Sequence, residues 1–289
     1  MKRAIFLYNN DAGRSKLDER AKEIVSILRE GGYDASSEIL DFKGDQLANR
    51  ADELDLVVVA GGDGTVNFIV NQLKQSGSKA TLGIIPSGTA NDFALALGMN
   101  RNPIKAAHQI ASGVEDCVDC GYVNGLYFVN IFSFGLFATT SQRTPNKWKR
   151  IYGKLAYIFQ GIKELEQMHD MELNINTDED SFKIKSLMTL VLNGRTAGGW
   201  RLANGASVTD GMFDCLILES KSFVSSLLAA LWFLVGGNPS GIRRLRSRNI
   251  QILSTENEPT DADGQRGVDF PLNIECLERE LKVIIPNRK

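Results

Sequence analysis

The sequence predicts two domains of different class: an α/β domain with a doubly wound parallel sheet, followed by a mainly antiparallel β-sandwich domain. The chain has 289 residues, about twice the ~150 residues of a typical domain. Strand-like and helix-like segments alternate up to about residue 115, which is typical of a parallel sheet covered by helices. Beyond residue 117, strand-like runs follow one another through turns, which favours antiparallel pairing. We therefore place the domains at residues 1–120 and 121–289.

The first domain is expected to begin with a strand at Lys2–Tyr8 and a helix that ends at Gly31-Gly32, because glycine commonly terminates helices. The next expected elements are a strand at Tyr33–Leu40, a short helix at Gly44–Glu53, strands at Leu56–Ala60 and Thr81–Ile85, and a helix at Phe93–Leu97. Leu56–Ala60 is continuously apolar and rich in valine, as in a strand buried on both faces of a parallel sheet.

The second domain is expected to contain many strands and few helices. The strands are predicted at Asp116–Tyr122, Leu126–Phe132, Met171–Asn176, Phe182–Leu192, Met212–Glu219, Asn249–Ser254, Leu272–Cys276 and Leu281–Ile285. The helices are predicted at Lys154–Met168, at Phe223–Val235 and, as a short one, near Ser240. Phe223–Val235 is the most apolar segment but is shorter than the ~20 residues that cross a bilayer. It is predicted to be a buried helix or, alternatively, a helix that rests on a membrane surface.

Composition narrows the class of function. A formal net charge of −2 argues against a nucleic-acid partner, which would require a basic surface. The four cysteines are scattered and the chain has only two histidines, so Cys117 and Cys120 are expected to be core thiols rather than a zinc site. Few cysteines and no signal peptide at Met1-Lys2-Arg3 indicate a cytoplasmic protein.

The segment Gly61–Thr65, with the sequence G-G-D-G-T, is the strongest candidate for a binding site. It joins the Leu56–Ala60 strand to a following helix. The amide groups and the positive dipole at a helix N-terminus bind anions, and glycines let the backbone approach a phosphate closely. Asp63 is the side chain that could reach a magnesium ion held by phosphates. The alternative is a tight Asp-Gly turn with no ligand.

Several spaced motifs resemble those of the diacylglycerol kinase catalytic-domain family, which includes bacterial soluble lipid kinases. The segment G-G-D-G-T is followed 23 residues later by Gly88–Phe93, G-T-A-N-D-F. Asn9–Gly13 resembles the family's first-strand turn, and Asp119-Cys120-Gly121 its D-x-G segment. Asp210–Asp214 resembles its D-G-x-L-D segment, and Asp263-Gly264-Gln265 its D-G-E motif.

This resemblance implies an ATP-dependent kinase that phosphorylates the primary hydroxyl of a diacylglycerol-like lipid, with the active site in the cleft between the domains. The residues expected to hold ATP are Asn9, Asn10, Asp11, Ala12, Gly13, Gly62, Asp63, Gly64, Thr65, Val66, Asn67 and Thr89. Asp63, Asp92 and Asp119 are expected to hold the catalytic Mg²⁺ and its waters. A second, structural Mg²⁺ is expected on Asp210, with the carbonyl groups of Ser207 and Met212.

Two departures from the family pattern bear on the chemistry. Phe68 stands where G-G-D-G-T-x-N is usually followed by glutamate, and Gln265 replaces the glutamate of D-G-E, the family's proton acceptor. A neutral amide cannot accept that proton. We therefore expect Asp263 to receive the proton and Gln265 to orient the hydroxyl. The alternatives are a non-catalytic lipid- or nucleotide-binding relative, and a soluble-substrate kinase such as an NAD kinase.

A lipid substrate implies transient contact with the inner face of a membrane. Phe223–Val235 and the basic run Arg243–Arg248 are the expected contact surface, because basic side chains are attracted to anionic lipids. The sequence leaves the oligomeric state open, a homodimer included.

Overall fold

A computed structural model of the protein describes residues 1–9, 14–44, 46–50, 53–135, 170–221, 223–234, 236–256 and 258–287. The chain divides into two compact units, Met1–Val118 with Arg279–Lys289, and Asp119–Glu278. The predicted ranges differ from this division at the C-terminus, since the last residues belong to the first unit. The chain therefore passes between the units twice, once within β5 (Val114–Val123) and once within β17 (Leu272–Ile285).

The first unit contains the predicted parallel sheet. Its strands are β1 (Lys2–Tyr8), β2 (Tyr33–Ile39), β3 (Leu56–Gly61) and β4 (Thr81–Pro86), in the order β17-β4-β3-β1-β2. All of these pairs are parallel, with Ala4 opposite Leu56 and Leu56 opposite Thr81. Leu56, Val57, Val58 and Val59 are fully buried, as their apolar run predicts.

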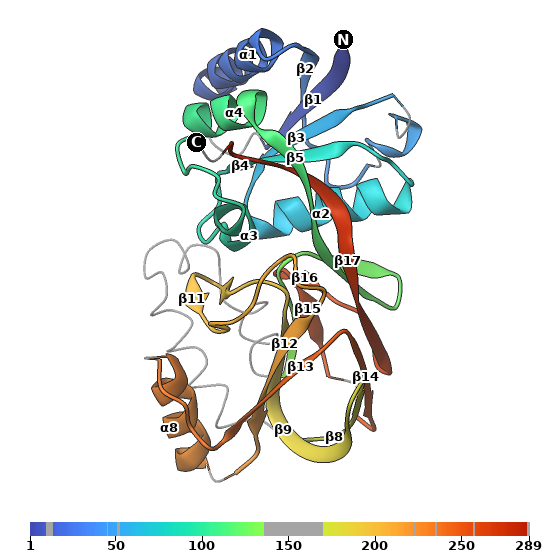
Figure 1. Ribbon diagram of the computed structural model, residues 1–289, viewed down its shortest axis with the longest axis vertical. Helices are drawn as coiled ribbons and strands as arrows, with labels where there is room; N and C mark the ends of the chain where they lie inside the picture. The colour runs from blue at the N-terminus through green and yellow to red at the C-terminus, as the bar shows by residue number, and fades with distance from the viewer. Residues whose placement is uncertain are drawn as a thin grey trace. The chain divides into compact units, whose positions relative to one another are not determined.

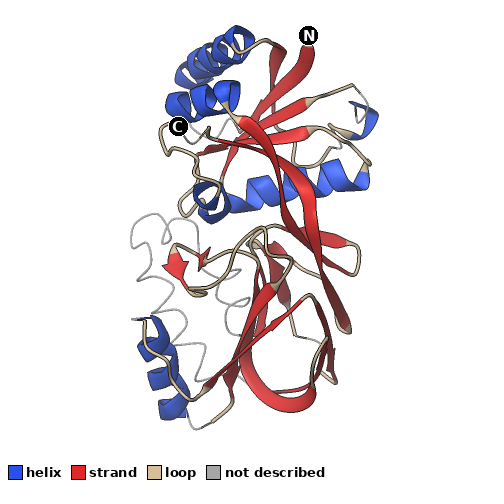
Figure 2. Ribbon diagram, viewed as in Figure 1, coloured by secondary structure: helices blue, strands red, loops and turns tan. Residues whose placement is uncertain are grey.

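Helices cover both faces of this sheet. Helices α1 (Arg14–Glu30) and α4 (Pro103–Ser112) lie together on one face, and α2 (Asp63–Gln75) lies on the other (Figures 1 and 2). The short α3 (Asp92–Ala96) follows β4. The predicted helix at Gly44–Glu53 is wrong over most of its length, because the residues described there form only a 3-10 turn, Ala48–Arg50. The nearby loop is instead held by side chains, since Gln46 Nε2 donates to the carbonyl of Ile39.

The second unit is built from antiparallel pairs. Its main strands are β6 (Leu126–Phe128), β7 (Ile131–Gly135), β8 (Met171–Thr177), β9 (Ser181–Leu192), β12 (Phe213–Glu219), β13 (Ile242–Ser247), β14 (Asn249–Ser254), β15 (Thr260–Ala262) and β16 (Gln265–Arg266). The short hairpin β10 (Thr196–Ala197) and β11 (Trp200–Arg201) stands apart from them. The long strand β9 pairs with β8 through its first half and lies between β7 and β12 through its second half. In this way β9 joins the part of the sheet that contains β8 and β14 to the part that contains β7 and β12.

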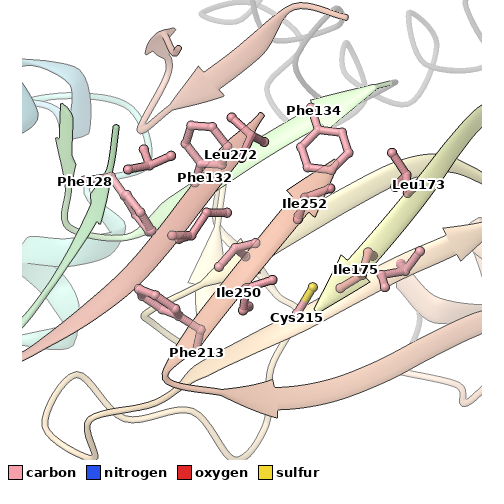
Figure 3. Close-up of a cluster of buried hydrophobic side chains, with 14 of the residues drawn as sticks. Phe128, Phe132, Phe134, Leu173, Ile175, Phe213, Cys215, Ile250, Ile252 and Leu272 are labelled. Carbon is pink, nitrogen blue, oxygen red and sulfur yellow. The ribbon is translucent and has the colours of Figure 1, made fainter. Parts of the chain in front are cut away.

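A cluster of buried apolar side chains fills this unit. Phe132 and Phe134 from β7, Phe213 from β12 and Ile250 and Ile252 from β14 point into the same space (Figure 3). Phe128 stacks on Phe213 with ring centroids 5.4 Å apart. A second cluster on the other side of β9 and β12 includes Leu216, Leu218 and Phe233 of α8 (Phe223–Leu234).

Three predicted elements of this unit need correction, and one lies outside the described residues. Leu126–Phe132 is two strands rather than one, because the amides of Val129 and Asn130 donate to the carboxylate of Asp263 instead of to a neighbouring strand. Leu272–Cys276 and Leu281–Ile285 belong to the single strand β17, in which Arg279 has a φ of 51°. Residues 236–241 form no helix near Ser240 but a glycine-containing turn into β13. The predicted helix at Lys154–Met168 lies outside the described residues.

Candidate functional site

A cavity of about 340 Å³ opens at the carboxyl ends of β1, β3 and β4 in the first unit. This size is within the range of small-molecule sites, and the carboxyl edge of an α/β sheet is where such sites form. The described residues that line it are Phe6, Tyr8, Asn9, Arg20, Ala21, Ile24, Ala60, Gly61, Gly62, Thr65, Ile85, Ser87 and Pro103.

The G-G-D-G-T segment forms the wall of this cavity between β3 and α2. Gly62 is the N-cap of α2, and its carbonyl accepts hydrogen bonds from the amides of Thr65 and Val66, both at 3.0 Å. A Cβ on Gly88 would lie 2.4 Å from the Cα of Gly62, so the two glycine turns are in direct backbone contact. No side chain caps α2, so its first amides are available to an anion.

Asp63 connects this turn to the start of the next helix. Its Oδ1 accepts a hydrogen bond of 3.2 Å from the amide of Phe93 in α3. Burial raises the pKa of the Asp63 carboxyl, and the nearby carboxylate of Asp92 raises it further, while the amides at the start of α3 oppose both effects. The side chains of Asp63 and Asp92 thus form an acidic pair in a poorly hydrated place.

Asp263 in the second unit is held by three consecutive amides. Its carboxylate accepts hydrogen bonds from Val129 N at 2.7 Å, Asn130 N at 3.0 Å and Ile131 N at 2.8 Å. Its own amide donates to the carbonyl of Ile131 at 2.9 Å. Asp263 and Gly264 form the two-residue loop between β15 and β16, with φ values of 51° and 87°. Positive φ at both positions is typical of the type I′ hairpin turn that Asp-Gly favours.

Asp119 and Asp210 lie around the loop that precedes β12. Asp119 is fully buried, and its Oδ2 accepts a hydrogen bond of 2.8 Å from the amide of Gly211. Asp210 is closer to solvent, and its Oδ2 forms an ion pair of 2.7 Å with the guanidinium of Arg246. Its other oxygen accepts a hydrogen bond of 3.2 Å from the amide of Met212.

Both halves of the chain match models of known protein families. The family model for the diacylglycerol kinase catalytic domain matches residues 3–123. The model described as YegS C-terminal NAD kinase beta sandwich-like domain matches residues 130–285. The chain is 34% identical over 297 residues to the diacylglycerol kinase of Bacillus subtilis strain 168, covering 100% of this chain and 98% of that relative. It belongs to the diacylglycerol kinase family.

The chain is also similar over nearly its whole length to other proteins named diacylglycerol kinases. The chain is 32% identical over 294 residues to the diacylglycerol kinase of Staphylococcus aureus strain bovine RF122 / ET3-1, covering 99% of this chain and 93% of that protein. A crystal structure from Bacillus anthracis strain Sterne, provisionally named a diacylglycerol kinase, has a TM-score of 0.83 and 25% identity over 98% of this chain and 95% of its own. The predicted fold class and family are therefore confirmed.

The structure brings only part of the predicted nucleotide set to the cavity. Asn9, Gly62 and Thr65 line it. Asp63 and Gly64 follow Gly62 at the start of α2, Thr89 is exposed beyond β4, and Val66 and Asn67 are buried. Asn10, Asp11, Ala12 and Gly13 lie outside the described residues.

Two features of the first unit could not be read from the motifs. Arg20 of α1 lines the cavity, and the only sequence signal for it is its place one turn before the buried Ile24. Phe68, which replaces the usual glutamate, packs against Phe42 with ring centroids 5.3 Å apart. Phe42 is 45% exposed, so this aromatic pair lies partly on the surface.

The candidate metal ligands fit Mg²⁺ unequally. Within the described part of the chain, no three His, Cys, Asp or Glu side chains gather as a metal site. Mg²⁺ next to phosphates needs only one or two carboxylates, and the acidic pair of Asp63 and Asp92 meets that need. At Asp210 the guanidinium of Arg246 already contacts the carboxylate, so a metal ion would have to displace it.

The surface of α8 has an apolar and partly exposed side. Leu228 and Trp232, four residues apart on one face, are 61% and 60% exposed. Among the helices that the structure describes, none is long and apolar enough to span a membrane. In the neighbouring basic run, Arg243 pairs with Asp180 at 3.0 Å and Arg246 with Asp210. The guanidinium of Arg244 lies 5.2 Å from the ring centroid of Phe233 in α8.

Proposed function

We propose that the protein is an ATP-dependent lipid kinase that transfers the γ-phosphoryl group of ATP to the primary hydroxyl of a diacylglycerol-like lipid. The observation that carries this proposal is the cavity at the carboxyl ends of β1, β3 and β4, walled by the uncapped N-terminus of α2. Relatives that match the whole chain are named diacylglycerol kinases.

In this proposal the nucleotide lies against the glycine turn, and the first unit provides its phosphate contacts. Gly62, Gly64 and Thr65 offer backbone amides and a hydroxyl, and Asn9 offers its amide. The buried Val66 and Asn67 keep the first turn of α2 in place. Asn10–Gly13 and Thr89 complete the proposed set by resemblance to the family.

Magnesium would supply charge neutralisation at the transferred phosphate, where most of the catalysis of phosphoryl transfer arises. The proposed holders are Asp63 and Asp92, whose mutual repulsion a cation would relieve, together with Asp119. The proposed structural Mg²⁺ would use Asp210 and the carbonyls of Ser207 and Met212, in competition with Arg246.

Asp263 and Gln265 are the candidates for the group that meets the proton of the acceptor hydroxyl. Gln265 is exposed at the start of β16 and carries no charge. Asp263 accepts three backbone hydrogen bonds with its two oxygens, so a role as base would add to a structural role. This observation favours a second candidate, a relative that binds lipid or nucleotide without transferring phosphate.

Incubation with γ-labelled ATP and Mg²⁺, followed by thin-layer chromatography, tests the proposal. The acceptors are diacylglycerol, ceramide, phosphatidylglycerol and NAD. A labelled lipid supports the lipid kinase, and label on NAD alone would mean a soluble-substrate kinase. No labelled product from the wild type, with ATP binding intact and activity gained in Gln265→Glu, would establish the non-catalytic candidate.

The lipid substrate also requires access to a bilayer, and we propose that α8 provides it from the cytoplasmic side. Leu228 and Trp232 are the exposed apolar side chains, whereas Arg243 and Arg246 already pair with carboxylates. Binding to anionic vesicles, measured by co-sedimentation, should therefore weaken more when Leu228 and Trp232 become Ser than when Arg243 and Arg246 become Gln. The reverse order would restore the basic run as the contact surface.

A further inference from the structure

Arg20 is the charged residue among the described residues that line the cavity of the first unit. The polar groups of the described lining include the guanidinium of Arg20, the hydroxyls of Tyr8, Thr65 and Ser87, the amide of Asn9 and the backbone of Gly61-Gly62. None of these described lining residues is Asp or Glu. A lining whose described residues include one cation, several hydrogen-bond donors and no carboxylate favours an anionic ligand.

The packing of α1 explains why Arg20 reaches the cavity. Ala21, Ile24 and Leu28 are buried on the face of α1 that packs on the sheet. Arg20 lies one turn before Ile24 and next to Ala21, so its side chain borders this buried face at the end near the carboxyl edge of β1. Ala21 and Ile24 line the same cavity.

Arg20 also differs from Arg29 on the same helix. Arg29 donates through Nε to the carbonyl of Ala35 at 3.0 Å and thereby ties α1 to β2. No ion pair recorded between described residues involves Arg20. Its guanidinium is therefore not committed to holding the described part of the fold together.

We propose that Arg20 binds the polyphosphate chain of the nucleotide, opposite the amides at the start of α2. The inference rests on the proposed function for the identity of the nucleotide, but the anion contact itself does not. Arginine suits this task because its planar guanidinium donates two parallel hydrogen bonds to a phosphate. A contact to phosphates predicts that the importance of Arg20 increases with the number of phosphates on the ligand.

Calorimetric titration of the full-length protein, without lipid, tests the proposal with ATP, ADP, adenosine and pyrophosphate. The variants are Arg20→Gln and Arg20→Lys, with Lys22→Gln as the matched control. Lys22 is exposed on the same helix, about 200° around the axis from Arg20, so its replacement removes an equal charge from another face. Because Arg20 forms no ion pair with another described residue, the melting temperature of each unliganded variant should equal that of the wild type.

We expect Arg20→Gln to weaken ATP binding ~10- to 100-fold, the loss typical of a charge-assisted hydrogen bond. ADP and pyrophosphate should be affected less than ATP, adenosine should be unaffected, and Arg20→Lys should restore part of the affinity. Equal ATP binding by the wild type and Arg20→Gln would overturn the inference, as would an equal loss for ATP and adenosine. If the wild type binds pyrophosphate through Arg20 but no nucleotide, the anion contact stands and the proposed function fails. If it binds none of these ligands, both fail.

Discussion

Replacing Asp263 by Asn separates a structural role of this carboxylate from a catalytic one. Asn also tolerates the left-handed backbone conformation, here with a φ of 51°, so the hairpin turn itself should survive. What changes is the number of acceptors, because the asparagine amide nitrogen cannot accept a hydrogen bond. The buried Val129 amide is held by one carboxylate oxygen, and the Asn130 and Ile131 amides are held by the other.

The expected loss follows from these contacts. At least one buried amide loses its acceptor, which costs about 1–3 kcal/mol, and the remaining hydrogen bonds lose the benefit of the charge. We expect Asp263→Asn to lower the free energy of unfolding by about 2–4 kcal/mol. At about 2–4 °C per kcal/mol for a unit of this size, the melting temperature should fall by ~4–16 °C.

Urea unfolding followed by tryptophan fluorescence measures this loss of stability in the second unit, which contains Asp263. The three tryptophans, Trp148, Trp200 and Trp232, all belong to Asp119–Glu278. Gln265→Ala is the control, since Gln265 is exposed at the end of the same hairpin, and its stability should equal that of the wild type. A wild-type unfolding midpoint for Asp263→Asn would refute the structural reasoning. If that variant is also inactive, Asp263 acts as the base.

Three further predictions concern other carboxylates. Asp63→Asn keeps an oxygen for the Phe93 amide but removes the charge, so kinase turnover should fall by at least ~10²-fold; unchanged turnover would leave the segment as a turn only. Hydrogen bonds from Asn249 and Ser247 lower the pKa of Asp178 from 3.8 to about 2, so its stabilising effect is complete above pH ~4 and is lost as the pH falls toward 2. Melting temperatures between pH 2 and 5 should therefore drop less steeply in Asp178→Asn. If Asp210 holds Mg²⁺, the ion should raise the melting temperature of the wild type but not of Asp210→Ala, and Arg246→Gln should strengthen the response. An equal shift in wild type and Asp210→Ala would remove that site.

The sequence was informative where local rules decide the structure. The valine run of Leu56–Ala60 predicts a buried parallel strand, and the glycine turn after it predicts an uncapped helix N-terminus; both are present. The Asp263-Gly264 pair also obeys a local rule, the type I′ hairpin turn. The family motif directed attention to its chemistry instead.

Features that depend on distant segments could not be predicted. The amides that hold Asp263 lie more than 130 residues away in sequence. The arginines of β13 appear in the sequence as one basic run, but their partners Asp180 and Asp210 come from separate loops. A charge run does not reveal how many of its charges are neutralised, and this number decides whether it can attract a membrane.

The last strand has a consequence for how the chain can be divided. Val283 of β17 pairs in parallel with Leu82 of β4, and the Asp116–Arg279 ion pair, 3.0 Å long, joins the two crossing strands. Ribosomal synthesis therefore delivers the second sheet partner of β4, after β3, only once the whole of Asp119–Glu278 has been made. A fragment that stops near residue 120 would leave the edge of β4 unpaired, and exposed apolar edges promote aggregation.

Exchange of modules between family members faces the same constraint. A hybrid that takes its first 118 residues from one protein should take Arg279–Lys289 from that protein too, because both segments build one unit. Circular permutation offers a cleaner division, because linking Lys289 to Met1 would make the first unit continuous in sequence. Segments that are far apart in the gene, Met1–Val118 and Arg279–Lys289, are thus neighbours in one folded unit.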